Sequence, residues 1–150
     1  MKISAIIPNC NHEHLIRDCI LALQNQTYKN FEVLIIDDAS TDNSVSTIKS
    51  LIATDNRFEL RVNEKNLGTV GCLNLGSELS SGELLYFGAA DDYILPNLFS
   101  DLVKCFENNP DISLASMMCL IKNPENNRGV LRPIFLPSRK QIKLGPDDFR

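Results

Sequence analysis

The sequence predicts an α/β protein built on a mostly parallel sheet that is flanked by helices. Two observations favour this class. Short apolar segments alternate with segments whose apolar residues recur at helical spacing, which is the pattern of strand–helix–strand units. Two of the apolar segments also lead into an aspartate pair, Asp37 with Asp38 and Asp91 with Asp92. Because open α/β sheets bind ligands beyond the carboxyl ends of their strands, both pairs are expected at one ligand-binding edge.

The predicted strands are short apolar runs bounded by turn residues. The first run stops at Pro8 and Asn9, and the second is apolar almost throughout, as expected for a parallel strand covered on both faces. In chain order the predicted strands cover residues 3–8, 31–37, 58–62, 83–90 and 112–121, and a further candidate covers residues 130–136.

Four helices are predicted between these strands from apolar residues three or four positions apart. The first covers residues 13–25, and Asp42 or Thr41 is placed to cap the second, which carries Val45 and Ile48. Pro96 fits the first turn of the fourth helix, which is expected to end near residue 108. The apolar residues that mark the third helix are Val70, Leu73, Leu75 and Leu79.

Composition and charge exclude several classes of protein. The chain of 150 residues has a formal net charge of −4, so it lacks the basic excess that nucleic-acid binding requires. No signal peptide is visible, and no apolar stretch approaches the ~20 residues that span a bilayer, so no transmembrane segment is expected. The odd number of cysteines and the absence of a C-x-x-C pair indicate reduced core residues of a cytoplasmic protein. They are Cys10, Cys19, Cys72, Cys105 and Cys119.

The aspartate pairs indicate the chemistry of the ligand. Hard divalent cations such as Mg²⁺ take oxygen ligands, often one or two carboxylates together with the phosphates of a substrate. Two pairs on one sheet edge are therefore suited to a divalent metal and a polyhydroxylated, phosphorylated ligand. A turn that caps a helix is the alternative interpretation of both pairs, because Asp satisfies free backbone amides.

The chain also resembles a known family through blocks that occur in the family's order and spacing. The chain is similar to family-2 glycosyltransferases over about its first hundred residues. The blocks are IIPNCN at residues 6–11, QNQTYKNFE at 24–32, IDDASTD at 36–42, NLG at 66–68 and 74–76, SGE at 81–83, and ADDYILP at 90–96.

This resemblance implies a glycosyltransferase A-type fold, in which a Rossmann-like nucleotide-binding half is joined to an acceptor-binding half. It implies transfer of a sugar from a nucleotide-sugar, most often a UDP-sugar, to a glycan, polysaccharide or lipid-linked acceptor. Pro8, Asn9 and Cys10 then border the base, and Asp38 accepts a hydrogen bond from it. A charged acceptor suits the imide N–H of uracil.

The resemblance assigns Asp91 and Asp92 to the ribose and to Mn²⁺ or Mg²⁺, which bridges the diphosphate. A bound cation would stabilise the charge that develops on the leaving nucleoside diphosphate. The sequence departs from the family's pattern at two positions. Ala89 stands where another Asp is usual, and Leu73 stands where many relatives carry Arg near the diphosphate.

Residues 1–121 are expected to bind the nucleotide-sugar, and residues 122–150 to form a loop and the start of an incomplete acceptor-side region. The resemblance places the catalytic base of an inverting enzyme in that later half, so the catalytic residue is unassigned and this chain alone is expected to lack it. Asp147 and Asp148 lack the family's surrounding motif. The expected location is cytoplasmic, at the inner face of the membrane if the protein associates with it peripherally.

Several other interpretations compete with this one. Ala89, Leu73 and the missing base favour a non-catalytic nucleotide-sugar-binding module, whereas Asp38, Asp91 and Asp92 are neutral between the two. A phospho-receiver domain is disfavoured because it needs a phosphorylatable Asp at the end of its third strand, where this chain has Asn63. A dinucleotide dehydrogenase is disfavoured because no G-x-G-x-x-G follows the first strand. His12 and His14 are interpreted as surface residues at a helix start rather than metal ligands, since residues two apart do not share a helical face.

Overall fold

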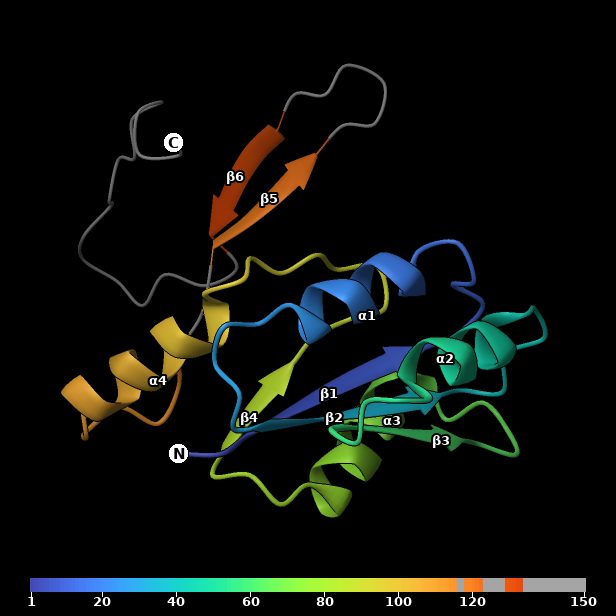
Figure 1. The fold of residues 1–150 in the computed structure, drawn as a ribbon, viewed down its shortest axis with the longest axis horizontal. Helices are drawn as coiled ribbons and strands as arrows, with labels where there is room; N and C mark the ends of the chain where they lie inside the picture. The colour runs from blue at the N-terminus through green and yellow to red at the C-terminus, as the bar shows by residue number, and fades with distance from the viewer. Residues whose placement is uncertain (116–117, 123–128, 134–150) are drawn as a thin grey trace. The chain divides into compact units, whose positions relative to one another are not determined.

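The computed structural model describes residues 1–115, 118–122 and 129–133, and the chain divides into two compact units, residues 1–108 and 109–150. The first unit contains a four-stranded sheet of β1 (Ile3–Asn9), β2 (Phe31–Asp37), β3 (Phe58–Val62) and β4 (Leu84–Phe87) (Figure 1). The strands are parallel and lie in the order β3-β2-β1-β4. This confirms the predicted α/β, Rossmann-like fold with a parallel sheet.

The strand order creates a switch point between β1 and β4. The chain moves from β1 outward to β2 and β3 and then crosses back to pair β4 with the other side of β1. Because such crossovers are right-handed, α1 (Ile16–Gln24) and α2 (Ser44–Ile52) cover one face, and the reversed crossover places α3 (Gly68–Leu79) on the other (Figure 1). Ligands of doubly wound sheets bind at this kind of switch point.

Within the first unit, three element boundaries differ from the sequence-based prediction by more than one residue. Helix α1 begins at Ile16 rather than residue 13, because the preceding residues form a turn in which both Leu15 and Ile16 donate their N–H to the carbonyl of His12. Strand β4 ends at Phe87, so residues 88–90 form a loop that carries the second aspartate pair beyond the strand. Helix α4 (Leu98–Asn108) begins two residues after Pro96, whose carbonyl accepts the N–H of Thr27.

The predicted apolar face of helix α3 is confirmed only in part, because Leu73 and Leu75 pack against the buried core cluster while Val70 and Leu79 do not. Cys72 and Gly76 are fully buried, whereas Val70 is 71% exposed and Leu79 is also exposed. The cause is a close approach of the helix to the sheet, since a Cβ atom on Gly76 would lie 2.3 Å from Cγ2 of Ile6 in β1. A glycine and a cysteine at the contact give little hydrophobic signal in the sequence, although they form the buried stripe.

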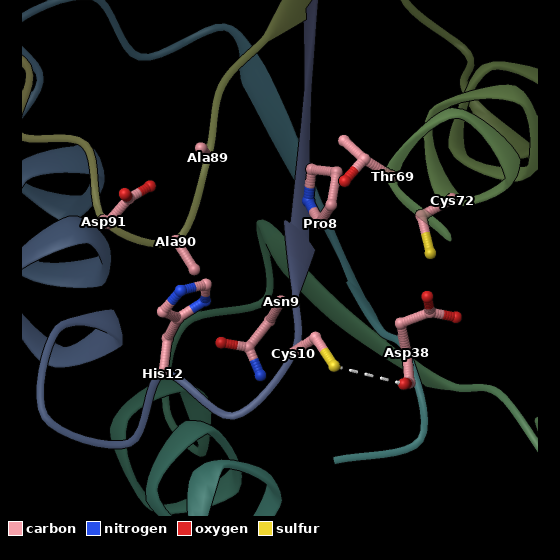
Figure 2. A pocket seen from close by; sticks show the side chains of 10 residues that line it. All are labelled: Pro8, Asn9, Cys10, His12, Asp38, Thr69, Cys72, Ala89, Ala90 and Asp91. Carbon is pink, nitrogen blue, oxygen red and sulfur yellow. Dashed lines mark hydrogen bonds between the residues drawn. The ribbon is translucent and has the colours of Figure 1, made fainter. Parts of the chain in front are cut away.

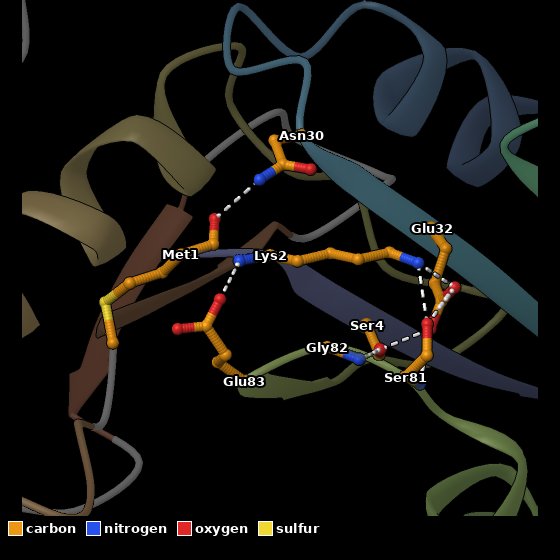
Figure 3. Close-up of polar contacts among 8 residues, drawn as sticks. All are labelled: Met1, Lys2, Ser4, Asn30, Glu32, Ser81, Gly82 and Glu83. Carbon is orange, nitrogen blue, oxygen red and sulfur yellow. Dashed lines mark hydrogen bonds and ion pairs between the residues drawn. The ribbon is translucent and has the colours of Figure 1, made fainter.

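The amino-terminal edge of the sheet is held together by the Glu32 carboxylate (Figure 3). Glu32 accepts hydrogen bonds from Lys2 Nζ at 2.5 Å, Ser4 Oγ at 2.6 Å and the backbone N–H of Ser81 at 2.7 Å. Partial burial would raise the pKa of Glu32, but these hydrogen bonds outweigh it and lower the pKa to about 2. One side chain thus joins β1, β2 and the segment that leads into β4.

The loop after β4 is anchored by the buried residues around α4. Phe99 is fully buried, and its ring meets those of Phe31 and Tyr86 edge to face at centroid distances of 5.2 and 5.5 Å. Gln26, also fully buried, donates to the carbonyl of Leu95 at 2.8 Å and accepts the N–H of Phe99 at 3.1 Å. These contacts fix the far end of the segment that contains the second aspartate pair.

The second unit contains an antiparallel pair of strands, β5 (Met118–Lys122) and β6 (Gly129–Pro133), with Leu120 opposite Leu131. The predicted strand over residues 112–121 is wrong in its first part, because residues 112–115 are not in a strand. Residues 134–136 of the sixth candidate strand lie outside the described residues. The division into functional portions at residue 121 stays a prediction.

No helix in the described parts of the chain combines the length and the apolar character that crossing a membrane requires.

Candidate functional site

A pocket of about 180 Å³ lies at the carboxyl ends of β1 and β2, where the loop after β4 faces them (Figure 2). Five residues that the sequence analysis assigned to the ligand line this one pocket. They are Pro8, Asn9, Cys10, Asp38 and Asp91. The other residues of the wall are His12, Thr69, Cys72, Ala89 and Ala90. The structure therefore brings the separate sequence motifs together, while the role of each residue toward a ligand stays a prediction.

Asp37 shapes the loop after β2 and is fully buried. Its carboxylate accepts hydrogen bonds from the N–H of Ser40 at 3.0 Å, from Ser40 Oγ at 2.7 Å and from Asn9 Nδ2 at 2.7 Å. These bonds close a tight turn in which Ala39 has a positive φ of 57°. Asp37 thus has a structural role at the edge of the pocket.

Asp38 is 4% exposed and caps the start of α3. One carboxylate oxygen accepts the N–H of Leu67 at 2.8 Å and Nδ2 of Asn63 at 2.9 Å, and the other accepts the N–H of Gly68 at 2.8 Å. Burial would raise the pKa of Asp38, but these hydrogen bonds and one from Cys72 prevail and lower it, so the carboxylate is ionised at neutral pH. Asp38 therefore caps helix α3, as the alternative interpretation of the aspartate pair expected. Its contact with a base stays a prediction.

The loops after β1 and β2 are joined by side-chain hydrogen bonds. Asn11, which has a positive φ of 56°, accepts the N–H of Thr41 at 2.7 Å through its side-chain oxygen. Asp42 accepts the N–H of Glu13 at 2.9 Å, and Asn43 Nδ2 donates to the carboxylate of Glu13 at 3.2 Å. Asp42 also accepts the N–H of Ser44, the first residue of α2, at 2.9 Å, as its predicted capping role requires.

Asp91 and Asp92 lie in the loop that faces β1. Asp91 lines the pocket, whereas Asp92 lies beside the pocket and accepts the N–H of Ala89 at 3.1 Å. Partial desolvation and the neighbouring Asp91 carboxylate raise the pKa of Asp92, and the hydrogen bond from Ala89 opposes them only in part. A raised pKa means that the local environment disfavours a second negative charge, which a bound cation would relieve.

Cys10, Cys19 and Cys72 form no disulfide. Burial raises the pKa of Cys19 and of Cys72 to about 12, and nearby carboxylates act in the same direction, so both stay protonated at neutral pH. Cys10 is half-buried and lies 3.6 Å from the carbonyl oxygen of Asp38. Cys119 lies in β5, where side chains are not described. The expectation that the cysteines are reduced stays a prediction.

His12 is the main pocket residue that the sequence analysis missed. His14 is exposed, as predicted for a surface residue, but His12 is only partly exposed and lines the pocket. The available signal was its place just after the Asn9–Asn11 segment, where the chain turns back from the end of β1. Thr69 and Cys72 were missed because they enter the pocket from the first turns of α3, whose orientation depends on Asp38.

A comparison with known families settles what this arrangement belongs to. The model of the family described as glycosyl transferase family 2 matches residues 4–148. The chain belongs to this family.

Curated relatives of this family-2 chain are bacterial glycosyltransferases. An uncharacterized glycosyltransferase of Haemophilus influenzae is 33% identical over 111 residues, which cover 74% of this chain and 34% of that protein. The GalNAc(5)-diNAcBac-PP-undecaprenol beta-1,3-glucosyltransferase of Campylobacter jejuni is 31% identical over 126 residues, which cover 83% of this chain and 40% of that protein. The chain thus spans a third to two fifths of these two relatives.

Solved structures of S. aureus TarS share the fold. Residues 1–349 of S. aureus TarS in complex with UDP-GlcNAc superpose with a TM-score of 0.69 at 27% identity, covering 87% of this chain and 37% of that chain. The same protein in complex with UDP gives a TM-score of 0.68 at 28% identity.

Proposed function

We propose that this chain binds the donor of a glycosyltransferase that moves a sugar from a nucleotide-sugar, UDP-linked, to a glycan or lipid-linked acceptor. The observation that carries the proposal is the convergence of Pro8, Asn9, Cys10, Asp38 and Asp91 on one pocket at the switch point of the sheet. TarS, which shares the fold, has been crystallised with UDP and with UDP-GlcNAc. The name of the Campylobacter relative describes a glucosyltransferase for an undecaprenol-linked glycan, which supports a lipid-linked acceptor. Action at the inner, cytoplasmic face of a membrane stays a prediction.

A divalent cation, Mn²⁺ or Mg²⁺, fits the chemistry of this site. Among the described residues, no group of three or more His, Cys, Asp or Glu side chains is arranged to hold a metal ion. A magnesium-type cation does not need such a group, because it retains waters and takes one or two carboxylates together with substrate phosphates. Asp91 and Asp92 are the residues that would hold it, and the raised pKa of Asp92 is consistent with a site that gains from added positive charge. When bound, the ion would stabilise the negative charge of the leaving nucleoside diphosphate.

The chain's own residues have two tasks in this proposal. The end of β1 and the Asp38 segment hold the nucleotide portion, and the loop of Asp91 faces the ribose and diphosphate from the other side. The acceptor and its catalytic base are assigned to the later part of the protein, where Asp147 and Asp148 lie outside the described residues. Without that base, the 150-residue chain is expected not to transfer sugar, since general-base catalysis contributes about 10²–10⁴-fold to such a rate.

Calorimetric titration of the chain with UDP tests donor binding and the metal together. We expect binding in the presence of Mn²⁺ or Mg²⁺ and at least a tenfold weaker affinity in EDTA. Asp92→Asn should lose most of this metal dependence, while the control Asp18→Asn, at an exposed position on α1, should keep it. Equal affinities with metal and with EDTA would remove the metal from the proposal, and absence of UDP binding would remove the proposal itself.

A non-catalytic nucleotide-sugar-binding module is the second candidate function. Ala89 and Leu73 favour it, because each replaces a polar residue that many relatives carry near the diphosphate. Transfer assays on the full-length protein, with a panel of nucleotide-sugars and lipid-linked acceptors, separate the two functions. Donor binding without transfer to any acceptor would support the binding module.

A further inference from the structure

The carboxylate of Asp38 is aimed at the start of helix α3. Figure 2 shows it pointing toward Cys72, while Cys10 lies beside the backbone carbonyl of the same residue. The N–H of Leu67 donates to one carboxylate oxygen at 2.8 Å, and the N–H of Gly68 donates to the other at 2.8 Å. Leu67 precedes the helix but cannot cap it, because its side chain is apolar. The loop after β2 therefore supplies the cap of a helix that begins 30 residues later in the chain.

Protein donors occupy the acceptor positions of this carboxylate. An ionised carboxylate has about four lone-pair positions, two on each oxygen. One oxygen accepts the N–H of Leu67 and, at 2.9 Å, Nδ2 of Asn63. The other accepts the N–H of Gly68, and the thiol of Cys72 donates to the same carboxylate. Because these donors fill the carboxylate and the Asp38 residue is only 4% exposed, its acceptor capacity is used within the protein before any nucleotide arrives.

The segment that Asp38 caps forms one wall of the pocket. Thr69 and Cys72 line the pocket from the first turns of α3. Cys72 is also part of the buried core cluster that contains Ile6 and Ile36, so this wall is joined to the sheet. The first N–H groups of a helix have no partner within the helix, and their loss of a cap favours fraying of the first turn. Removing the Asp38 carboxylate should therefore loosen the wall that Thr69 and Cys72 present to a ligand.

We propose that Asp38 is a positioning residue of the donor site, whose carboxylate holds the start of α3 against the pocket while other groups contact the base. This inference rests on the proposed function, because it requires a nucleotide in the pocket. It has two consequences that can be measured separately. Donor affinity should depend on the cap that Asp38 provides, and the preference for one base over another should not depend on Asp38.

Calorimetry with UDP and with CDP in the presence of Mn²⁺ tests both consequences. The two bases differ at N3, where uracil donates a hydrogen bond and cytosine accepts one, so a carboxylate that contacted this position would favour UDP. Asp38→Ala should weaken the binding of both nucleotides by a common factor of about 3- to 10-fold, the value of a typical helix cap, and keep their affinity ratio within about twofold. Asp18→Ala, at an exposed position on α1, is the matched control and should keep both affinities.

Asn63→Ala is a second variant that leaves Asp38 in place. Asn63 donates to Asp38 from outside the pocket wall, so this change frees one acceptor position and weakens the hold on the cap. A carboxylate that contacted the base would keep or improve its affinity for UDP in this variant. The positioning role instead predicts weaker binding of UDP and CDP alike. Urea unfolding followed by circular dichroism establishes the folded fraction, because a merely structural residue would change the free energy of unfolding without changing the affinity of the folded protein.

The outcomes separate this inference from the proposed function. If the wild-type chain does not bind UDP, both fail. If UDP binds and Asp38→Ala moves the ratio of UDP to CDP affinity toward one, the carboxylate contacts the base and only this inference fails. Wild-type affinity in folded Asp38→Ala, or unchanged or improved affinity in Asn63→Ala, also overturns the positioning role alone. If Asp38→Ala does not fold, the affinities of Asn63→Ala for the two nucleotides decide the question.

Discussion

Replacing Glu32 by Gln should destabilise the protein at neutral pH and have much less effect in acid. The Glu32 carboxylate accepts hydrogen bonds from Lys2, Ser4 and Ser81, and an amide at this position would present a donor to groups that are themselves donors. The variant therefore loses the charge and also leaves hydrogen-bond donors without an acceptor. The amino-terminal edge of the sheet should loosen first, since these bonds join β1, β2 and the start of β4.

The size of the effect follows from the pKa of the carboxyl group. Its fall from 4.5 to about 2 corresponds to roughly 3 kcal/mol of stability, at about 1.36 kcal/mol per unit. The Glu32 side chain is 21% exposed and that of Lys2 is 35% exposed, so solvent screening reduces the effect, and we expect about 1.5–3 kcal/mol. Because the folded-state pKa is depressed, this stability is present above about pH 4.5 and is lost as the pH falls toward 2.

Urea unfolding followed by circular dichroism at pH 7 and at pH 3 measures the difference between wild type and variant. The difference should be about 1.5–3 kcal/mol at pH 7 and clearly smaller at pH 3. Below about pH 4.5 protonation of Glu32 stabilises the unfolded wild type, while the folded carboxylate, with its pKa of about 2, stays mostly ionised. Glu78→Gln, at an exposed position on α3, controls for loss of a surface charge and should change stability by less than about 0.5 kcal/mol. A difference that is the same at both pH values would refute the assignment of this stability to the ionised carboxylate.

Three further predictions concern backbone strain, packing and thiol reactivity. Ala39→Gly should raise the free energy of unfolding by about 1 kcal/mol, because Ala39 has a positive φ of 57° that costs a non-glycine residue about this amount; a lower stability in urea unfolding would contradict the strain argument. Gly76→Ala should lower the free energy of unfolding by about 1–3 kcal/mol despite the better helix propensity of Ala. The reason is that the new Cβ would lie 2.3 Å from the fully buried side chain of Ile6. Glu78→Ala on the same helix is the control and should change the free energy of unfolding very little. Iodoacetamide at pH 8 followed by mass spectrometry should modify half-buried Cys10 well before Cys19 or Cys72, whose buried thiols have a pKa of about 12; early labelling of Cys72 would show that α3 opens readily.

The strands of the parallel sheet were predictable because burial on both faces leaves a direct record in the sequence. The apolar runs that became β1 and β2 are covered on both sides and stop at turn residues, so their ends were placed within a residue. Strand β3 is mostly exposed, and its bounds were found from its alternating pattern instead. Strand β4 was predicted too long because residues 88–90 are small and apolar and look like a continuation of the strand. The pairing of β4 with β1 nevertheless ends at Phe87, which lies opposite Ile6. Composition does not record where pairing stops.

The gathering of the pocket residues was predictable from the order of the motifs, but the orientation of their side chains was not. Asp38 was expected to face a ligand, and its carboxylate also caps α3, a contact between segments 29 and 30 residues apart. His12 was missed because its direction depends on the turn at Asn11, a conformation with positive φ that no pattern of apolar residues encodes. The pairing of β5 with β6 was not predicted, because an apolar run in the sequence does not indicate which other strand it pairs with.

The hydrogen bonds that join the loop after β1 to the loop after β2 have a consequence for engineering and for divergence within the family. Asn11 and Glu13 on one loop bind the backbone or side chains of residues 41–43 on the other. A substitution on either loop removes a partner from the other, so the effects of paired substitutions should not add. If one loop alone were replaced by that of a relative, its hydrogen-bond partners on the other loop would be missing. The two loops are therefore best exchanged together.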